Sequence, residues 1–187
     1  MRETVHPIEQ ESFAILRSRV DLSGRPPLSR AVIERVVHSS ADLSYVEDLV
    51  LDEPALQQGL DALRSGAAIV ADVQMVAAGI TTRDVVCRVR QATATDELTR
   101  SAAAIRDAFQ EVGPGAVYVI GCAPTALFEI VAGHYQPALV IGLPVGFVGA
   151  AESKAALRES GLPAVSNTSE KGGSAVAAAA LNALLYR

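Results

Sequence analysis

The sequence predicts an α/β domain of three layers, αβα, with a mainly parallel sheet at its centre. Two observations lead to this fold class. Three units of one design follow one another in the second half of the chain: an apolar run, a loop with Gly or Pro, and a helix. Repeated units of this kind are typical of parallel sheets with helices on both faces. Half of the residues are apolar, but only 4% are aromatic and Trp is absent. Ala, Val, Leu and Ile must therefore fill the core, which suits helices packed closely on a sheet.

The first third of the chain is predicted to be helical. Apolar residues at helical spacing predict helices at 7–20, 28–39 and 54–65, with the loop SGRPP at 23–27. Gly66 follows the third helix, where Gly commonly ends one. We expect these N-terminal helices to pack alongside the sheet. A length of 187 residues suits one domain, so residues 1–187 are assigned to a single domain.

The pattern then changes to strands. The apolar run AAIVADV at 67–73 is typical of a buried parallel strand, and DVVCRV at 84–89 alternates as a strand does. A long helix follows at about 100–111, and GPG at 113–115 makes a turn. The three repeated units complete the chain: AVYVIG-CAPTA-ALFEIVAGH, ALVIGL-PVGFVGA-ESKAALRES and PAVSN-TSEKGG-SAVAAAALNALL.

Ligands of parallel sheets bind outside the carboxyl ends of the strands. In this chain that edge is predicted to carry residues 121–125, 144–149 and 168–174. We therefore expect the ligand site at the carboxyl edge. The net charge of −5 and the lack of a basic block argue against a nucleic-acid partner. An anionic ligand would need local cations and backbone amides.

The chain has no predicted membrane span or metal site. MRETVHPIEQES lacks an apolar signal region, and PALVIGLPVGFVGAA is interrupted by Gly and Pro and shorter than the roughly 20 residues of a spanning helix. Cys87 and Cys122 lie far apart beside apolar residues, as buried reduced thiols of a cytosolic protein do. No H-x-x-x-H, C-x-x-C or P-loop pattern occurs. We expect a soluble cytoplasmic protein.

Two helix starts are candidate anion sites. KGGS opens the last helix, where the amides of Gly172 and Gly173 and the charge of Lys171 favour an anion. The pattern alone also fits a plain tight turn. Thr99 is a good N-cap, and Arg100 would then be the first helical residue, where it can bind a carboxylate. Spacing alone also fits a solvated surface arginine.

His38 is the candidate acid or base. Arg35 lies three residues before it on one helix face, and Glu34, four residues before it, is a possible orienting carboxylate. A histidine titrates near neutral pH, with an ordinary pKa of about 6.5. The pattern alone also fits a structural histidine beside the core. Asp72, at the end of a predicted strand, is either functional or the cap of a following helix.

Seven ordered blocks identify a family resemblance. They are SFAILR, RVVHSSAD, GAAIVADVQMVAAGIT, TRSAAA, GCAPTALFEI, LPVGFVGAAESKAAL and KGGSAVAAAALNALL. Together they cover almost the whole chain, and PVGFVGAAESK is the most specific. The chain resembles the precorrin-8X methylmutase family of cobalamin biosynthesis, whose members are also called precorrin isomerases or cobalt-precorrin-8 methylmutases.

The resemblance implies an isomerase that moves a methyl group from C-11 to C-12 of a corrinoid, giving hydrogenobyrinate or its cobalt counterpart. It implies no cofactor and no methyl donor, because the shift is intramolecular. It also implies a homodimer with the site shared between subunits. His38 corresponds to the family's proton donor, and Ser12 and Arg35 to substrate contacts. Arg100 matches the T-R-S block.

The substrate's many carboxylates suit the anchors Arg35, Arg100, Lys171 and the amides of Gly172 and Gly173. Two alternatives remain open at this stage. One is a relative that binds and delivers the corrinoid without turnover. The other, resting on KGGS alone, is an α/β enzyme for a phosphorylated metabolite.

Overall fold

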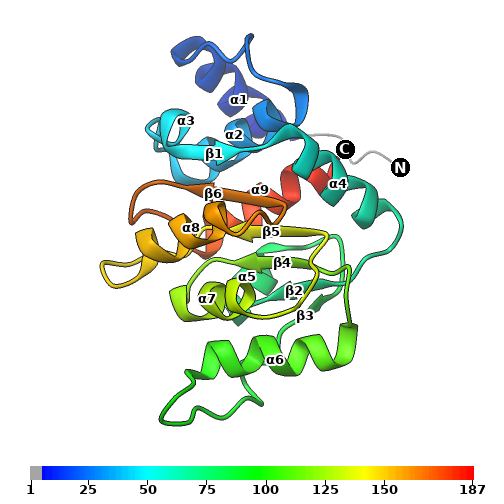
Figure 1. Cartoon of the computed structure of the whole chain (residues 1–187). Helices are drawn as coiled ribbons and strands as arrows, with labels where there is room; N and C mark the ends of the chain where they lie inside the picture. The colour runs from blue at the N-terminus through cyan, green and yellow to red at the C-terminus, as the bar shows by residue number, and fades with distance from the viewer. Residues whose placement is uncertain (1–5) are drawn as a thin grey trace.

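A six-stranded sheet with the order β1-β6-β5-β4-β2-β3 forms the centre of the computed structural model, which describes residues 6–187 (Figure 1). The strands are β1 Leu49–Leu51, β2 Ile69–Ala71, β3 Val85–Val86, β4 Val117–Ile120, β5 Leu139–Gly142 and β6 Ala164–Asn167. All neighbouring strands are parallel except β1, which runs antiparallel to β6 at one edge. The mainly parallel sheet is therefore confirmed.

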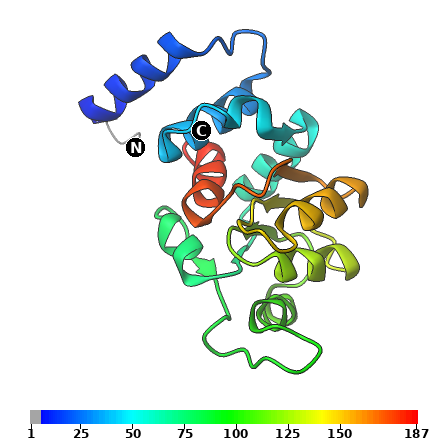
Figure 2. The ribbon, with the colours of Figure 1, turned by 90° about the vertical axis from the view of Figure 1, so that its left-hand side faces the viewer.

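Within the described residues, helices surround this sheet, and six of them cover its two faces. The helices are α1 Pro7–Arg19, α2 Pro27–Ser40, α3 Tyr45–Asp48, α4 Glu53–Arg64, α5 Gln74–Gly79, α6 Arg100–Val112, α7 Pro124–Ala132, α8 Ala150–Glu159 and α9 Ser174–Leu185. Helices α4, α5 and α9 pack on one face with α2 outside α9, and α6, α7 and α8 pack on the other. Figure 2 shows α1 lying outside the body formed by the other elements. The three-layer αβα prediction is confirmed, with the N-terminal helices alongside.

Alternation along the strands divides the core in two. Val117 and Val119 of β4 belong to the cluster with α4 and α9, whereas Tyr118 and Ile120 belong to the cluster with α6 and α7. Successive side chains of a strand point to opposite faces, so a strand covered on both sides must be apolar throughout. Every residue of β4 and β5 is buried, which explains the continuous apolar runs in the sequence.

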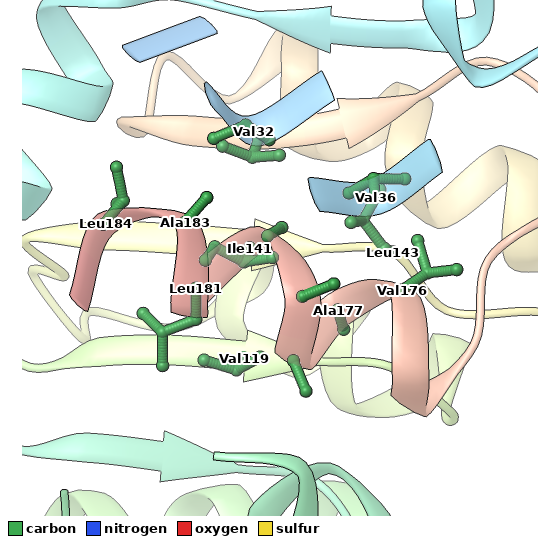
Figure 3. Close-up of a cluster of buried hydrophobic side chains, with 14 of the residues drawn as sticks. Val32, Val36, Val119, Ile141, Leu143, Val176, Ala177, Leu181, Ala183 and Leu184 are labelled. Carbon is green, nitrogen blue, oxygen red and sulfur yellow. The ribbon is translucent and has the colours of Figure 1, made fainter. Parts of the chain in front are cut away.

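Helix α2 packs on α9, and this contact places the end of α2 at the carboxyl edge of the sheet. Nine residues of α9 are buried, as expected for a helix that is apolar all round. In Figure 3, Val36 of α2 lies beside Val176 at the start of α9 and beside Leu143 just after β5. The C-terminal end of α2, which carries His38, therefore lies at the carboxyl edge of the sheet.

Three short elements have no bounds in the sequence prediction: α3, α5 and β1. They span four, six and three residues, too short for a clear hydrophobic period. The strand expected at 84–89 is reduced to the two residues of β3. Among the described residues, no helix is long and apolar enough to cross a membrane.

Candidate active site

Two consecutive residues of α1 contact the imidazole of His38, in the last turn of α2. The hydroxyl oxygen of Ser12 lies 2.8 Å from Nδ1 of His38. The Phe13 ring stacks on the imidazole, with ring centroids 4.8 Å apart and planes inclined by 20°. All three side chains are half-buried. Ser12 therefore fixes one ring nitrogen and Phe13 fixes the ring plane, while Nε2 forms no hydrogen bond within residues 6–187.

Glu34 does not orient His38, so that expectation is wrong. Both of its carboxylate oxygens accept hydrogen bonds from Arg17 of α1, at 2.8 Å each. The Arg17 hydrogen bond outweighs burial and lowers the pKa of Glu34. The long Arg17 side chain reaches Glu34 from α1 and occupies both of its carboxylate oxygens. This ion pair joins α1 to α2 instead.

Arg35 also contacts α1. Its Nη2 donates to Oε1 of Glu9 at 3.0 Å, and its guanidinium carbon lies 4.6 Å from the Tyr186 ring centroid and 5.7 Å from that of Phe13. The side chain lines a cavity of about 400 Å³ between α1, α2 and the end of α9. A guanidinium has five N–H donors, so the contact with Glu9 leaves others for a ligand.

The segment between β6 and α9 is tied to the segment after α2. Nζ of Lys171 donates to Oδ2 of Asp42 at 2.6 Å and to the Ser44 hydroxyl at 2.7 Å. The hydrogen bond from Lys171 lowers the pKa of Asp42 to about 2. Lys171 is therefore at the carboxyl edge, near the end of α2, but already paired.

The two glycines that follow Lys171 pack against the chain after β5. A Cβ at Gly172 would overlap the carbonyl of Leu143, and its φ of 156° is one that side chains rarely adopt. The amide of Gly173 donates to the same Leu143 carbonyl at 2.9 Å. The Gly173 amide expected to hold an anion is thus already bonded within the chain.

Arg100 lies away from His38. It is exposed and is the first residue of α6, which Thr99 caps by accepting a hydrogen bond from Ala102, as expected. The hydroxyls of Thr99 and Thr125 are 2.7 Å apart, so α6 and α7 start together at the carboxyl edge. Figure 1 shows α6 and α1 at opposite ends of the molecule. One chain thus brings Ser12, Arg35 and His38 together but not Arg100.

Asp72 has a role that the sequence prediction missed. Its carboxylate is fully buried and accepts from the amides of Gly121, Cys122 and Ala123 at 3.1, 2.8 and 2.8 Å. Burial raises its pKa and outweighs these hydrogen bonds. It makes no side-chain cap on α5, so the cap expectation is wrong. Asp72 instead shapes the loop that opens α7.

Lys154 of α8 was also missed. Its ammonium is fully buried and donates to Oδ1 of Asn167 at 2.8 Å, to the carbonyl of Lys171 at 2.7 Å and to the carbonyl of Ser169. The sequence did carry one indication that Lys154 is buried. Its spacing places it on the same helix face as Ala150 and Leu157, and that face is buried.

The expectation of two buried thiols holds for Cys87 but not for Cys122. Cys87 is buried and free, and Cys122 is free and half-buried, and burial raises the pKa of both thiols. Within residues 6–187, no three His, Cys, Asp or Glu side chains are grouped to hold a metal ion.

Comparison with known proteins gives a consistent match. The family model described as Precorrin-8X methylmutase matches residues 7–187. The cobalt-precorrin-8 methylmutase of Salmonella typhimurium is 42% identical, over 96% of this chain and 93% of that protein. The precorrin-8X methylmutase of Pseudomonas aeruginosa is 42% identical, over 95% and 93%. The solved precorrin-8x methyl mutase of Thermus thermophilus superposes with a TM-score of 0.86 at 35% identity, over 96% of each chain.

Proposed function

The chain belongs to the precorrin-8X methylmutase family, and we propose that it moves a methyl group from C-11 to C-12 of precorrin-8X or cobalt-precorrin-8. The product is then hydrogenobyrinate or cobyrinate. Family membership makes the chain an isomerase of cobalamin biosynthesis. The observation that carries the proposal is a family match over residues 7–187, which includes every helix and strand around His38. The relatives named for the metal-free and the cobalt-bearing substrate are equally similar, at 42% identity, so both substrates are candidates.

We assign the proton donor to His38. As a proton donor His38 acts in its imidazolium form: Nδ1–H donates to the Ser12 hydroxyl oxygen 2.8 Å away, and the transferable proton is on Nε2, the nitrogen that Ser12 and Phe13 leave unoccupied. A placed acid of this kind contributes about 10²- to 10⁴-fold to a rate. Holding the macrocycle so that the migrating methyl faces C-12 must supply the remainder.

The atoms balance as follows. The bond between the methyl group and C-11 breaks as a bond to C-12 forms, and His38 gives one proton to the ring system. An isomerisation leaves the molecular formula unchanged, so a different ring position must return one proton to the imidazole. No methyl donor and no oxidant or reductant enters this scheme.

The carboxylates of the substrate are assigned to cationic and amide anchors. Arg35 keeps donors beyond the one that Glu9 accepts. Lys171 is at the same edge, and a substrate carboxylate would compete there with Asp42. The backbone amide of Gly172 is a weaker candidate for binding a substrate carboxylate. The Gly173 amide is not included, because Leu143 accepts its hydrogen bond.

We further propose a homodimer in which each site is completed by Arg100 of the partner subunit. The position of α6, at the opposite end of the chain from α1, supports this arrangement. Arg100 is exposed at the carboxyl edge and free to face a second copy. The enzyme is proposed to act in the cytoplasm on a small corrinoid and not on nucleic acid, in line with its net charge of −5.

The test is a visible absorption assay with precorrin-8X and cobalt-precorrin-8 in parallel. Rearrangement changes the conjugation of the ring, so the spectrum should progress with time at substoichiometric enzyme. A spectrum that shifts at once on binding and then stays constant with both substrates would instead describe a carrier.

A further inference from the structure

Lys154 is an unusual lysine. The chain has two lysines, Lys154 and Lys171, and the side chain of Lys154 has no exposed surface. A lysine is almost never fully buried unless its charge is paired or hydrogen-bonded. Its three oxygen partners all lie in or next to the segment 168–173, called here the β6–α9 loop: Oδ1 of Asn167 and the carbonyls of Ser169 and Lys171.

Asp48 of α3 holds the same loop through other groups. Its Oδ1 accepts from the amides of Thr168 and Ser169 at 3.0 and 2.9 Å, and its Oδ2 accepts from Nδ2 of Asn167 at 2.7 Å. Burial opposes the charge of Asp48, but the hydrogen bonds outweigh it and lower its pKa to about 2. The loop is thus held between a carboxylate that binds its amides and an ammonium that binds its carbonyls.

This loop leads directly to the proposed site. Lys171 reaches Asp42, two residues beyond the end of α2, and Gly173 bonds to Leu143 after β5. A change in the loop would therefore move Lys171 and loosen the contact with the helix that carries His38.

We propose that Lys154 is a positioning residue: its ammonium fixes the β6–α9 loop in the shape that presents Lys171 and Gly172 to the substrate and ties the loop to the end of α2. This inference rests on the proposed function for the identity of the substrate. Lys154 itself touches no substrate, because it is fully buried behind the loop.

Three acceptors explain why this group is a lysine. An ammonium has three N–H donors, one for each oxygen, and its charge strengthens each bond. An apolar side chain of the same length would leave Oδ1 of Asn167 without its donor, and the carbonyls of Ser169 and Lys171 would keep only the weaker, uncharged donor Nδ2 of Asn167, at 3.4 and 3.0 Å. The charged groups around the ammonium are Asp48 of α3, Arg158 of α8 and Glu170 of the loop.

The first experiment compares Lys154→Met with Lys171→Met, which removes the other lysine but keeps the three bonds of Lys154. Hydrogen exchange of the amides of Thr168, Ser169 and Lys171 should accelerate about tenfold or more in Lys154→Met, while β4 and β5 stay protected. The KM for the corrinoid should rise more than kcat falls. In Lys171→Met the amides of Thr168 and Ser169 should exchange as in the wild type. Unchanged loop exchange in a folded Lys154→Met variant would overturn the inference.

A second measurement needs no variant and no substrate. An NMR spectrum of protein labelled with ¹⁵N-lysine and ¹³C-carbonyls should show two Nζ resonances, one for each lysine. Burial lowers the pKa of Lys154 to about 8, so its resonance should titrate near that pH. The carbonyl shifts of Ser169 and Lys171 should follow the titration of Lys154 with the same midpoint. Carbonyl shifts of Ser169 and Lys171 that do not change as Lys154 titrates would refute the proposal. Because neither readout uses turnover, a failure of the proposed isomerase activity would be seen separately.

Discussion

The hydroxyl of Ser12 on α1 and Nδ1 of His38 on α2 lie 2.8 Å apart, although the two residues are 26 positions apart in the sequence. The contact determines which ring nitrogen is held by the protein and which is left for the substrate. Because α1 packs on the rest of the molecule through few buried side chains, with only Leu16 buried, the orientation of His38 depends on a small number of specific contacts. Each of these contacts can be removed separately.

Ser12→Ala should lower kcat by about two- to tenfold, the value of one neutral hydrogen bond, with a smaller change in KM. The imidazole keeps its contact with Phe13 but loses the hydroxyl that holds Nδ1 and so directs Nε2. Ser18→Ala is the control, because Ser18 is an exposed serine of the same helix that bonds to the Ile15 carbonyl. Equal effects of the two substitutions would mean that Ser12 acts only through the stability of α1.

Phe13→Leu should also reduce kcat, because a ring stack contributes about 0.5–1.5 kcal/mol beyond its buried area. Leu keeps apolar contact with His38 but not the parallel ring at 4.8 Å. Phe13→Tyr keeps the ring and should retain most of the activity. Steady-state kinetics of the three proteins test this, and a Leu variant as active as the Tyr variant would contradict a role for stacking.

Acid should destabilise the fold through Asp48. Its pKa is lowered from 3.8 to about 2 in the folded state, so the folded state binds fewer protons than the unfolded state between these values. The stabilisation is present above about pH 4 and is lost as the pH falls toward 2, by up to about 2 kcal/mol. Denaturant unfolding of the wild type and Asp48→Asn from pH 6 to pH 2 should show the difference between them shrinking. A difference that is independent of pH would show that Asp48 is not ionised in the fold.

Subunit complementation tests whether the site is shared. Arg100→Ala and His38→Ala should each be inactive or strongly impaired as homodimers. Mixing them after dissociation should restore roughly a quarter of the wild-type activity, because half of the dimers are then mixed and each mixed dimer has one intact site. Mixed protein with no more activity than the separate variants would place Arg100 and His38 in the same subunit's site or remove Arg100 from it.

The longer strands and the longer helices could be predicted from the sequence, because the patterns that indicate them are local. Continuous apolar runs such as β4 and β5 follow from burial on both faces. The N-cap Thr99 and the start of α9 after Gly173 follow from residue type. The face shared by Arg35 and His38 follows from helical spacing alone.

The contacts between elements could not be predicted in this way. The partner of Glu34 is Arg17, at 17 residues' distance, because the crossing of α1 over α2 brings them together. The burial of Lys154 depends on acceptors in a loop that the sequence does not place. Charged side chains at helical spacing fit both a solvated face and a buried one, and only packing decides between them.

The role of His38 is tested most directly by comparing binding and turnover in His38→Ala. This variant is expected to bind hydrogenobyrinate with nearly wild-type affinity, because other groups hold the ring. With precorrin-8X its visible spectrum should shift on binding and then remain constant, while the wild type converts the substrate. Conversion at an appreciable rate by His38→Ala, or loss of product binding in proportion to activity, would contradict the assignment of His38 as the proton donor.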